Sequence, residues 1–246
     1  MPPNGGVVDV TPANLIDARG PAGASRTIAG TDISDTVLGG ARGERIDPRA
    51  GTVDRVDAGR GPDRVRGGPG EDGIDGGQGN DVLRGGSRHD YLTGGPGRDR
   101  LRDRGRGSLL GEAGNDRLSA EHLSGTLDGG AGDDVLIARG RLRRTGLAGG
   151  PGNDRYVLRG GGVPEIVELP RGGYDTIATS RKLTVPAGVQ RAVATGSRRV
   201  RLRGGFGAQR LVGNRARNVL RGGPGADRLS GRGGNDTVIL GDDAFD

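Results

Sequence analysis

The sequence predicts an all-β fold in which short strands stack on one another as a solenoid. Aspartates recur at intervals of nine residues, at Asp54, Asp63, Asp72, Asp81, Asp90 and Asp99. An apolar side chain stands two residues after each of them, as Val56 does after Asp54. Glycines precede most of these aspartates, so the unit reads Gly-Gly-x-Gly-x-Asp-x-apolar-x. A fixed short period of this kind is typical of stacked repeat architectures.

Each part of the unit has an expected structure. Glycine tolerates positive φ, so the first four residues can turn tightly and direct carbonyl oxygens inward. The last three residues are expected to form a short strand whose middle side chain faces the interior. Outside the regular run, the same frame recurs at Asp35, Asp116, Asp134, Asp154, Asp227 and Asp236. Because the chain keeps this phase, a disordered Gly/Asp-rich linker is a poor alternative.

The repeats divide the chain into four predicted parts. Residues 1–29 are expected to be an N-terminal leader or cap, and residues 30–158 the first repeat block. Residues 159–203 change character and are predicted to form an irregular β segment, with short strands separated by Gly and Pro. Residues 204–246 are predicted to be a second repeat block with an acidic tail. Within the blocks, other residues stand where Asp is expected, at Glu44, Ser108, Gly125, Gln209 and Asn218.

The pattern predicts binding of several calcium ions. It places one carboxylate at the same point of every rung, next to glycine carbonyls, and such oxygen ligands suit a hard cation. Calcium takes six to eight oxygens in flexible geometry, whereas magnesium demands tighter geometry and zinc prefers Cys or His. The chain has no Cys and two His. The predicted metal ligands are Asp35, Asp54, Asp63, Asp72, Asp81, Asp90, Asp99, Asp116, Asp134, Asp154, Asp227 and Asp236.

The composition predicts that the metal is needed for folding. The 246 residues include 54 Gly but only 2 Phe, 3 Tyr and no Trp, so an ordinary globular core cannot form. Without Cys, disulfides cannot stabilise the chain. We therefore expect a largely disordered metal-free chain, and calcium binding that supplies the folding free energy.

Residues 27–158 and 204–240 resemble the hemolysin-type calcium-binding repeats of the RTX family. The segment Asn153-Asp154-Arg155-Tyr156-Val157-Leu158, followed by Val167-Glu168 and Gly173-Tyr174-Asp175-Thr176-Ile177, also resembles a stretch common in such chains. The resemblance implies a parallel β-roll of two facing sheets, with eighteen residues per turn and calcium between loops two repeats apart. It further implies type I secretion and an extracellular location. The calcium concentration outside cells is millimolar, which is enough to fill weak calcium sites.

With eighteen residues per turn, Asp63, Asp81 and Asp99 share one edge, which Asp116 continues, and Asp54, Asp72 and Asp90 share the other. The outward positions beside the first edge are Arg64, Arg66, Arg84, Arg100, Arg102 and Arg117. We expect an arginine ladder on this face, and the net charge is +6. Such a face can bind an anionic polysaccharide or cell surface; the alternative is a solvated face in a chain that uses Arg instead of Lys. Nucleic acid is a weaker candidate, because aromatic interleaving is missing.

The sequence shows no catalytic constellation. His89 and His122 both fall in repeat loops, and neither a His-Glu-x-x-His nor a Gly-x-Ser-x-Gly motif occurs. We expect a protein that is not an enzyme, with a secreted, structural or surface-interaction role. One alternative is the calcium-dependent folding and secretion module of a larger enzyme; another is a binder of anionic polymers through the arginine face. No stretch is apolar enough for a membrane span, and the N-terminus lacks the pattern of a secretory signal peptide.

Overall fold

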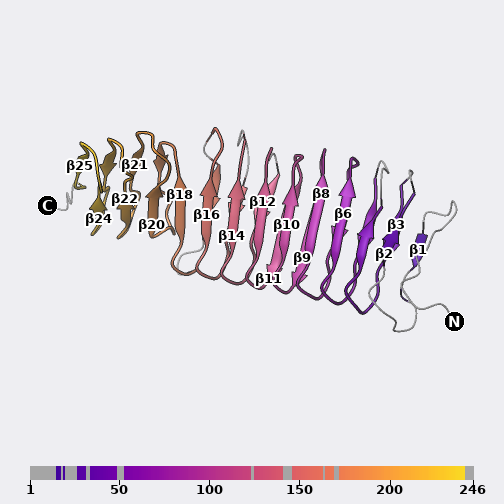
Figure 1. Ribbon diagram of the computed structural model, residues 1–246. Helices are drawn as coiled ribbons and strands as arrows, with labels where there is room; N and C mark the ends of the chain where they lie inside the picture. The colour runs from indigo at the N-terminus through magenta and orange to yellow at the C-terminus, as the bar shows by residue number, and fades with distance from the viewer. Residues whose placement is uncertain are drawn as a thin grey trace.

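The computed structural model describes residues 15–17, 19, 27–31, 34–48, 53–122, 125–140, 146–162, 164–168 and 172–241. These residues form an elongated stack of short parallel strands, with the two chain ends at opposite ends of the stack (Figure 1). Among them no helix is long and apolar enough to cross a membrane. The predicted all-β solenoid is confirmed.

Two sheets face each other along most of the stack. The odd-numbered sheet has nine strands: β1 (Leu15–Asp17), β3 (Thr36–Leu38), β5 (Arg55–Asp57), β7 (Gly73–Asp75), β9 (Tyr91–Pro96), β11 (Ser108–Ala113), β13 (Thr126–Asp128), β15 (Gly146–Ala148) and β17 (Glu165–Val167). The even-numbered sheet has twelve: β2 (Thr27–Ala29), β4 (Arg45–Asp47), β6 (Arg64–Gly68), β8 (Val82–Gly86), β10 (Arg100–Asp103), β12 (Arg117–Ala120), β14 (Val135–Ala138), β16 (Arg155–Leu158), β18 (Thr176–Thr179), β20 (Arg191–Ala194), β22 (Arg210–Val212) and β24 (Arg228–Ser230). A third sheet has four: β19 (Leu183–Thr184), β21 (Arg201–Arg203), β23 (Val219–Arg221) and β25 (Thr237–Ile239).

Each strand pairs with the strand one full turn away. In the even-numbered sheet, Leu83 of β8 lies beside Val65 of β6 and beside Leu101 of β10, which puts eighteen residues between partners. The strands are short because only the middle residue is apolar and inward; the residues on either side of it are polar in most rungs and face solvent. Parallel pairing in this register repeats the same residue type at the same height of every rung, as a β-roll requires.

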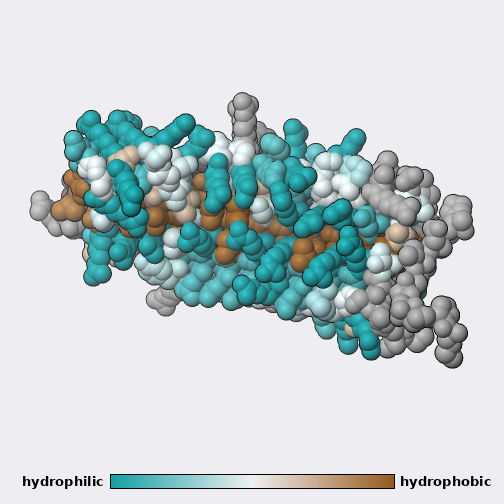
Figure 2. Space-filling view, in the orientation of Figure 1, coloured by the Kyte–Doolittle hydropathy of each residue, from teal (hydrophilic) through white to brown (hydrophobic). Residues whose placement is uncertain are grey.

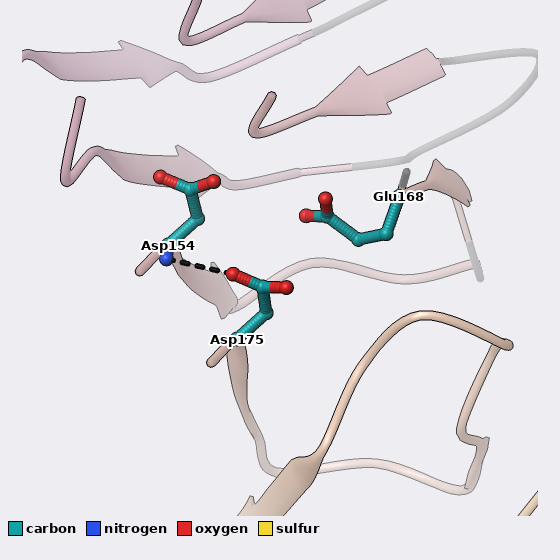
Figure 3. Close-up of side chains that lie close together, drawn as sticks. All are labelled: Asp154, Glu168 and Asp175. Carbon is teal, nitrogen blue, oxygen red and sulfur yellow. Dashed lines mark hydrogen bonds between the residues drawn. The ribbon is translucent and has the colours of Figure 1, made fainter. Parts of the chain in front are cut away.

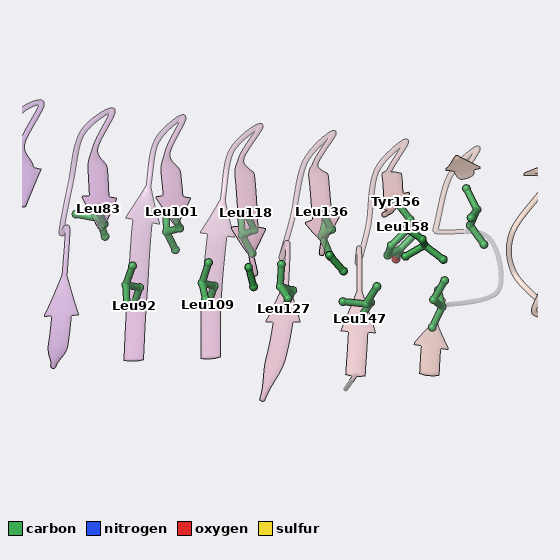
Figure 4. Packing of buried hydrophobic residues seen from close by; sticks show 14 of the residues in the cluster. Leu83, Leu92, Leu101, Leu109, Leu118, Leu127, Leu136, Leu147, Tyr156 and Leu158 are labelled. Atoms are coloured by element: carbon green, nitrogen blue, oxygen red, sulfur yellow. The ribbon is translucent and has the colours of Figure 1, made fainter. Parts of the chain in front are cut away.

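The core is a double file of aliphatic side chains between the sheets. Leu83, Leu101, Leu118 and Leu136 from the even-numbered sheet meet Leu92, Leu109, Leu127 and Leu147 from the odd-numbered sheet (Figure 4). All of them are buried. Aliphatic burial is the main stabilising term that the chain's own side chains supply, at about 1.5–3 kcal/mol for each fully buried residue.

The segment 159–203 interrupts only one of the two sheets. On the even-numbered side, β18 pairs with β16 and β20 pairs with β22, so the sheet runs from the first repeat block into the second. On the other side the odd-numbered sheet ends at β17, and the four-stranded sheet begins at β19. Residues in the predicted N-terminal leader or cap also contribute strands, because Ile16 of β1 and Ile28 of β2 are buried in the core.

Candidate metal sites

The predicted ligands stand directly before strands and form hydrogen-bonded rows along the edges of the stack. In each row the Oδ1 atom of an aspartate accepts a hydrogen bond from the backbone N–H of the residue one turn earlier. Asp81 accepts from Asp63 at 2.7 Å, and Asp99 accepts from Asp81 at 2.7 Å. One row contains Asp63, Asp81, Asp99, Asp116, Asp134 and Asp154; the other contains Asp35, Asp54, Asp72 and Asp90.

The second carboxylate oxygen of most of these aspartates is buried and accepts no hydrogen bond. This holds for the Oδ2 atoms of Asp54, Asp63, Asp72, Asp81, Asp90, Asp99, Asp116, Asp134, Asp154 and Asp227. A buried carboxylate oxygen without a partner costs free energy unless a cation binds it or a proton neutralises it. The rows therefore have the oxygen chemistry that calcium needs.

Glycine leaves space beside these oxygens. A Cβ atom added to Gly76 would lie 2.7 Å from Asp81 Oδ2 and 2.6 Å from the carbonyl oxygen of Gly94. A carboxylate oxygen of one rung and a carbonyl oxygen of the next thus border the same small space, which a side chain at this position would fill. Carboxylate and carbonyl oxygens are the ligands that calcium prefers, so the residues present fit the ion.

Burial raises the pKa of the row aspartates from Asp54 to Asp154. Desolvation is the largest cause, and the backbone N–H that each carboxylate accepts opposes it only partly. The pKa of Asp99 and Asp134 rises to about 7, and that of Asp81 and Asp154 to about 6. At neutral pH, a carboxyl group with such a raised pKa is partly protonated. A bound cation would favour its charged form and displace the proton.

Two predicted ligands differ from the others. Asp35 uses both carboxylate oxygens within its own loop, because Thr31 donates its backbone N–H at 2.8 Å and its hydroxyl at 3.0 Å. Asp236 is half-buried near the C-terminal end of the stack and accepts the backbone N–H of Asn218 at 2.8 Å. Neither of them presents the buried, unpartnered oxygen that marks the central rungs.

Two side-chain amides donate to loop oxygens, Gln209 to the preceding turn and Asn218 to its own. Gln209 donates its Nε2 to the carbonyl of Val189 at 2.8 Å. Asn218 donates its Nδ2 to the carbonyl of Ala216 at 2.5 Å and to Asn214 Oδ1 at 3.1 Å. In these rungs an N–H group of the chain bonds to loop oxygens, and this accounts for the absence of a carboxylate there.

The rung after Asp90 corrects the sequence-based alignment. Ser108 was expected at the ligand position, but it pairs with Tyr91 and so starts the strand, which leaves Gly107 beside Asp90. The nearest carboxylate in this loop is that of Asp103, which is fully buried and accepts from the backbone N–H groups of Gly105 and Gly107 at 3.0 Å each. Like Asp35, Asp103 uses both carboxylate oxygens within its own loop. Because this unit is short, its carboxylate lies four residues before Gly107, at a position where the nine-residue frame does not predict one.

Asp175 is a further member of the first row that the sequence analysis did not include among the ligands. Its Oδ1 accepts from the backbone N–H of Asp154 at 2.8 Å, its side chain is fully buried, and its Oδ2 has no hydrogen-bond partner. The signal was present, because Asp175-Thr176-Ile177 has the Asp-x-apolar frame and Gly173 precedes it. A spacing of 21 residues from Asp154, instead of 18, placed it out of phase.

The comparison with known families agrees with this geometry. The family model of the RTX calcium-binding nonapeptide repeat matches the chain in four copies, over residues 51–83, 75–102, 125–140 and 203–238. The chain therefore carries RTX calcium-binding repeats, folded as a β-roll. Among the predicted ligands, Asp35, Asp116 and Asp154 lie outside the matched residues. A search of the curated proteins finds no match.

Proposed function

We propose that this chain is a secreted calcium-binding repeat protein whose β-roll folds when calcium binds, with a structural or surface-interaction role. The observation that carries the proposal is the row of buried Oδ2 oxygens that accept no hydrogen bond. Without a cation, adjacent rungs would bury like charges, or the carboxylates would have to hold protons. Binding of calcium to the folded state stabilises that state by mass action.

The proposed location is extracellular. Repeat sites built from carboxylates and loop carbonyls suit the millimolar calcium outside cells and would stay empty at cytosolic levels. Type I export fits the same proposal, since a chain that stays unfolded until it meets calcium can be exported before it folds.

The proposed role is binding and not catalysis. His89 is an exposed loop residue whose Nδ1 lies 3.5 Å from Glu71 Oε1. The carboxylates near one another in the rows are accounted for by the repeat, which places one on every rung.

Calcium titration of chelator-treated protein, followed by circular dichroism, tests the proposal. We expect a weak β signal without calcium and a cooperative gain of β signal as calcium is added. Magnesium at the same concentration should give little change. If the metal-free and calcium-loaded chains have the same spectrum and the same melting temperature, the proposal is wrong.

A second candidate function is binding of an acidic polysaccharide through the arginine face, which we define as Arg64, Arg66, Arg84, Arg100, Arg102 and Arg117. These side chains are exposed on β6, β8, β10 and β12. Arg66 lies beside Arg84, and Arg100 lies beside Arg117 in the same register. Neighbouring strands are about 4.8 Å apart, so like charges face each other along the sheet and a polyanion would relieve their repulsion. Figure 2 shows a strip of apolar side chains flanked by hydrophilic ones along the stack.

Retention on immobilised heparin in the presence of calcium tests this second candidate. The double variant Arg66→Glu/Arg84→Glu should elute at lower salt than the unmodified chain, because it reverses two charges of the face. Arg55→Glu, on the odd-numbered sheet, is the matched control and should elute with the unmodified chain. Absence of retention at low salt removes this function.

A further inference from the structure

Three carboxylates meet where the odd-numbered sheet ends. Asp154 precedes β16, Glu168 follows β17, and Asp175 precedes β18. Each offers one oxygen that lies within 4.8 Å of those of the other two. In Figure 3 the Glu168 side chain extends from the opposite side of the roll toward the two aspartates. This arrangement differs from the repeat rungs, whose carboxylates all come from one row.

The two aspartates have unused ligand capacity at this point. Asp154 is 1% exposed and Asp175 is 0% exposed. The Oδ2 atom of each is buried and accepts no hydrogen bond. Two charged oxygens that are buried and unpartnered, next to a third carboxylate, are destabilising unless a cation binds them.

The third carboxylate is held in place by a buried tyrosine. The hydroxyl of Tyr156, which is fully buried in the core, donates a hydrogen bond to Glu168 Oε1. Since Tyr156 lies on β16, two residues after Asp154, this bond ties the end of β17 to the even-numbered sheet. The hydroxyl is a positioning group for Glu168.

We propose that Glu168 joins Asp154 and Asp175, the last two carboxylates of the first row, in a calcium site that binds the ion more tightly than the sites formed by row aspartates alone. This inference rests on the proposed calcium binding. The affinity of calcium sites rises with the number of charged ligands, and three carboxylates converge here. The cluster lies outside the residues that the repeat family matches. Its ion joins both faces of the roll where the spacing lengthens to 21 residues.

Calcium titration calorimetry on the full chain tests this site with two variants, one at Glu168, which directly follows β17, and one at Glu165 on β17. Glu168→Gln removes one charged ligand and should weaken the tightest binding phase by at least the ~10–100-fold that loss of a ligand's supporting partner typically costs. Glu165→Gln, at an exposed position of β17, should leave that phase unchanged. If Glu168→Gln keeps the tightest phase, the site is wrong. If the unmodified chain binds no calcium, the proposed function itself fails.

Terbium(III) gives a second test that does not require Glu168→Gln to fold. Tyr156 touches a proposed ligand, so it should sensitise the luminescence of the first terbium ion bound. Tyr156→Phe keeps all three carboxylates and should reduce this emission, whereas Tyr91→Phe should not. Tyr174 is present in both variants and contributes equally to them. First-equivalent emission that Tyr156→Phe leaves unchanged would overturn the inference.

Discussion

At the scale of the residue, each row aspartate from Asp54 to Asp154 has two functions in one side chain. Its Oδ1 atom accepts the backbone N–H of the previous turn, as in Asp134, which accepts from Asp116 at 2.7 Å. Its Oδ2 atom is left for an ion. The first contact fixes the carboxylate in position before any metal arrives, so the ligand geometry depends on formation of the stack. Ion binding and folding are therefore linked.

The raised pKa values predict that, without metal, the fold is more stable in acid. The folded pKa values are about 6 for Asp81 and about 7 for Asp99, against about 3.9 in an unfolded chain. The folded state therefore binds more protons. The stability that this supplies is fully present below about pH 4 and is lost as the pH rises through about 6 to 7.

Circular dichroism of the metal-depleted chain should show more β signal at pH 5 than at pH 8, because protonation replaces part of what the ion supplies. With calcium in excess the order should reverse, because the ion binds the deprotonated carboxylates and displaces their protons. A metal-depleted chain whose β signal increases from pH 5 to pH 8 would contradict the prediction.

At the scale of the element, the loop before each strand decides whether a rung needs an ion. Most rungs with Asp leave a buried carboxylate oxygen without a hydrogen bond, and the rungs of Gln209 and Asn218 bond loop oxygens with amide N–H groups. On the proposed function, the stack thus contains turns of two kinds, one closed by a metal and the other closed by the chain.

Asn218→Asp should convert one kind of turn into the other. The new carboxylate would replace an N–H donor with an acceptor beside the carbonyl of Ala216. At the lowest calcium concentration that folds the unmodified chain, we expect a loss of about 1–3 kcal/mol in the free energy of unfolding, the cost of unpaired buried groups. With calcium in excess we expect the stability to be regained and the bound calcium to rise. Asn80→Asp, at an exposed loop position, is the control for an added charge. Equal calcium content in the two variants would speak against this account.

Glycine is sterically required at some positions of the repeat unit and not at others. Gly77 has φ of +80°, and a Cβ there would collide with the carbonyl oxygen of Gly59. Gly73 has ample space, since nothing lies within 4 Å of its added Cβ. Gly77→Ala should lower the free energy of unfolding in calcium by more than about 1 kcal/mol, the cost of positive φ for an L-residue. Gly73→Ala should be near neutral in the same denaturation measurement. Similar effects of the two substitutions would contradict this assignment.

At the scale of the whole molecule, the stack is nearly one-dimensional. Each rung contacts its neighbours, and the continuous even-numbered sheet joins the two repeat blocks through β18 and β20. In such a protein, stability is the sum of the rungs and of the interfaces between them. The C-terminal end is less covered than the middle, since Val238 is 46% exposed whereas Leu118 is 0% exposed.

Small-angle scattering should register this as a large change in size. For 246 residues the radius of gyration of an unfolded chain is roughly 50 Å and that of a compact chain roughly 20 Å. We expect calcium to move the chain from near the first value to near the second. A radius that is already compact after removal of calcium would show that the stack forms without the ion.

The sequence by itself determined the repeat, and with it much of the fold. The Asp-x-apolar frame predicted which side chains enter the core, because Leu83 and Leu101 repeat at the period of the stack and a period of two within each strand fixes their direction. The same frame predicted the aspartates at the edges. These features are local, so a short stretch of sequence contains all the information that they need.

Tertiary structure alone decided what happens where the period fails. The sequence showed Asp103 and Asp175, but only the structure showed that Asp103 is held by backbone N–H groups of its own loop and that Asp175 continues the row. Glu168 reaches Asp154 from the opposite side of the roll. The physical reason is that such contacts depend on how much chain each turn consumes. That length varies from one irregular loop to another. Which residues meet is set by the pairing of the strands on either side of each loop.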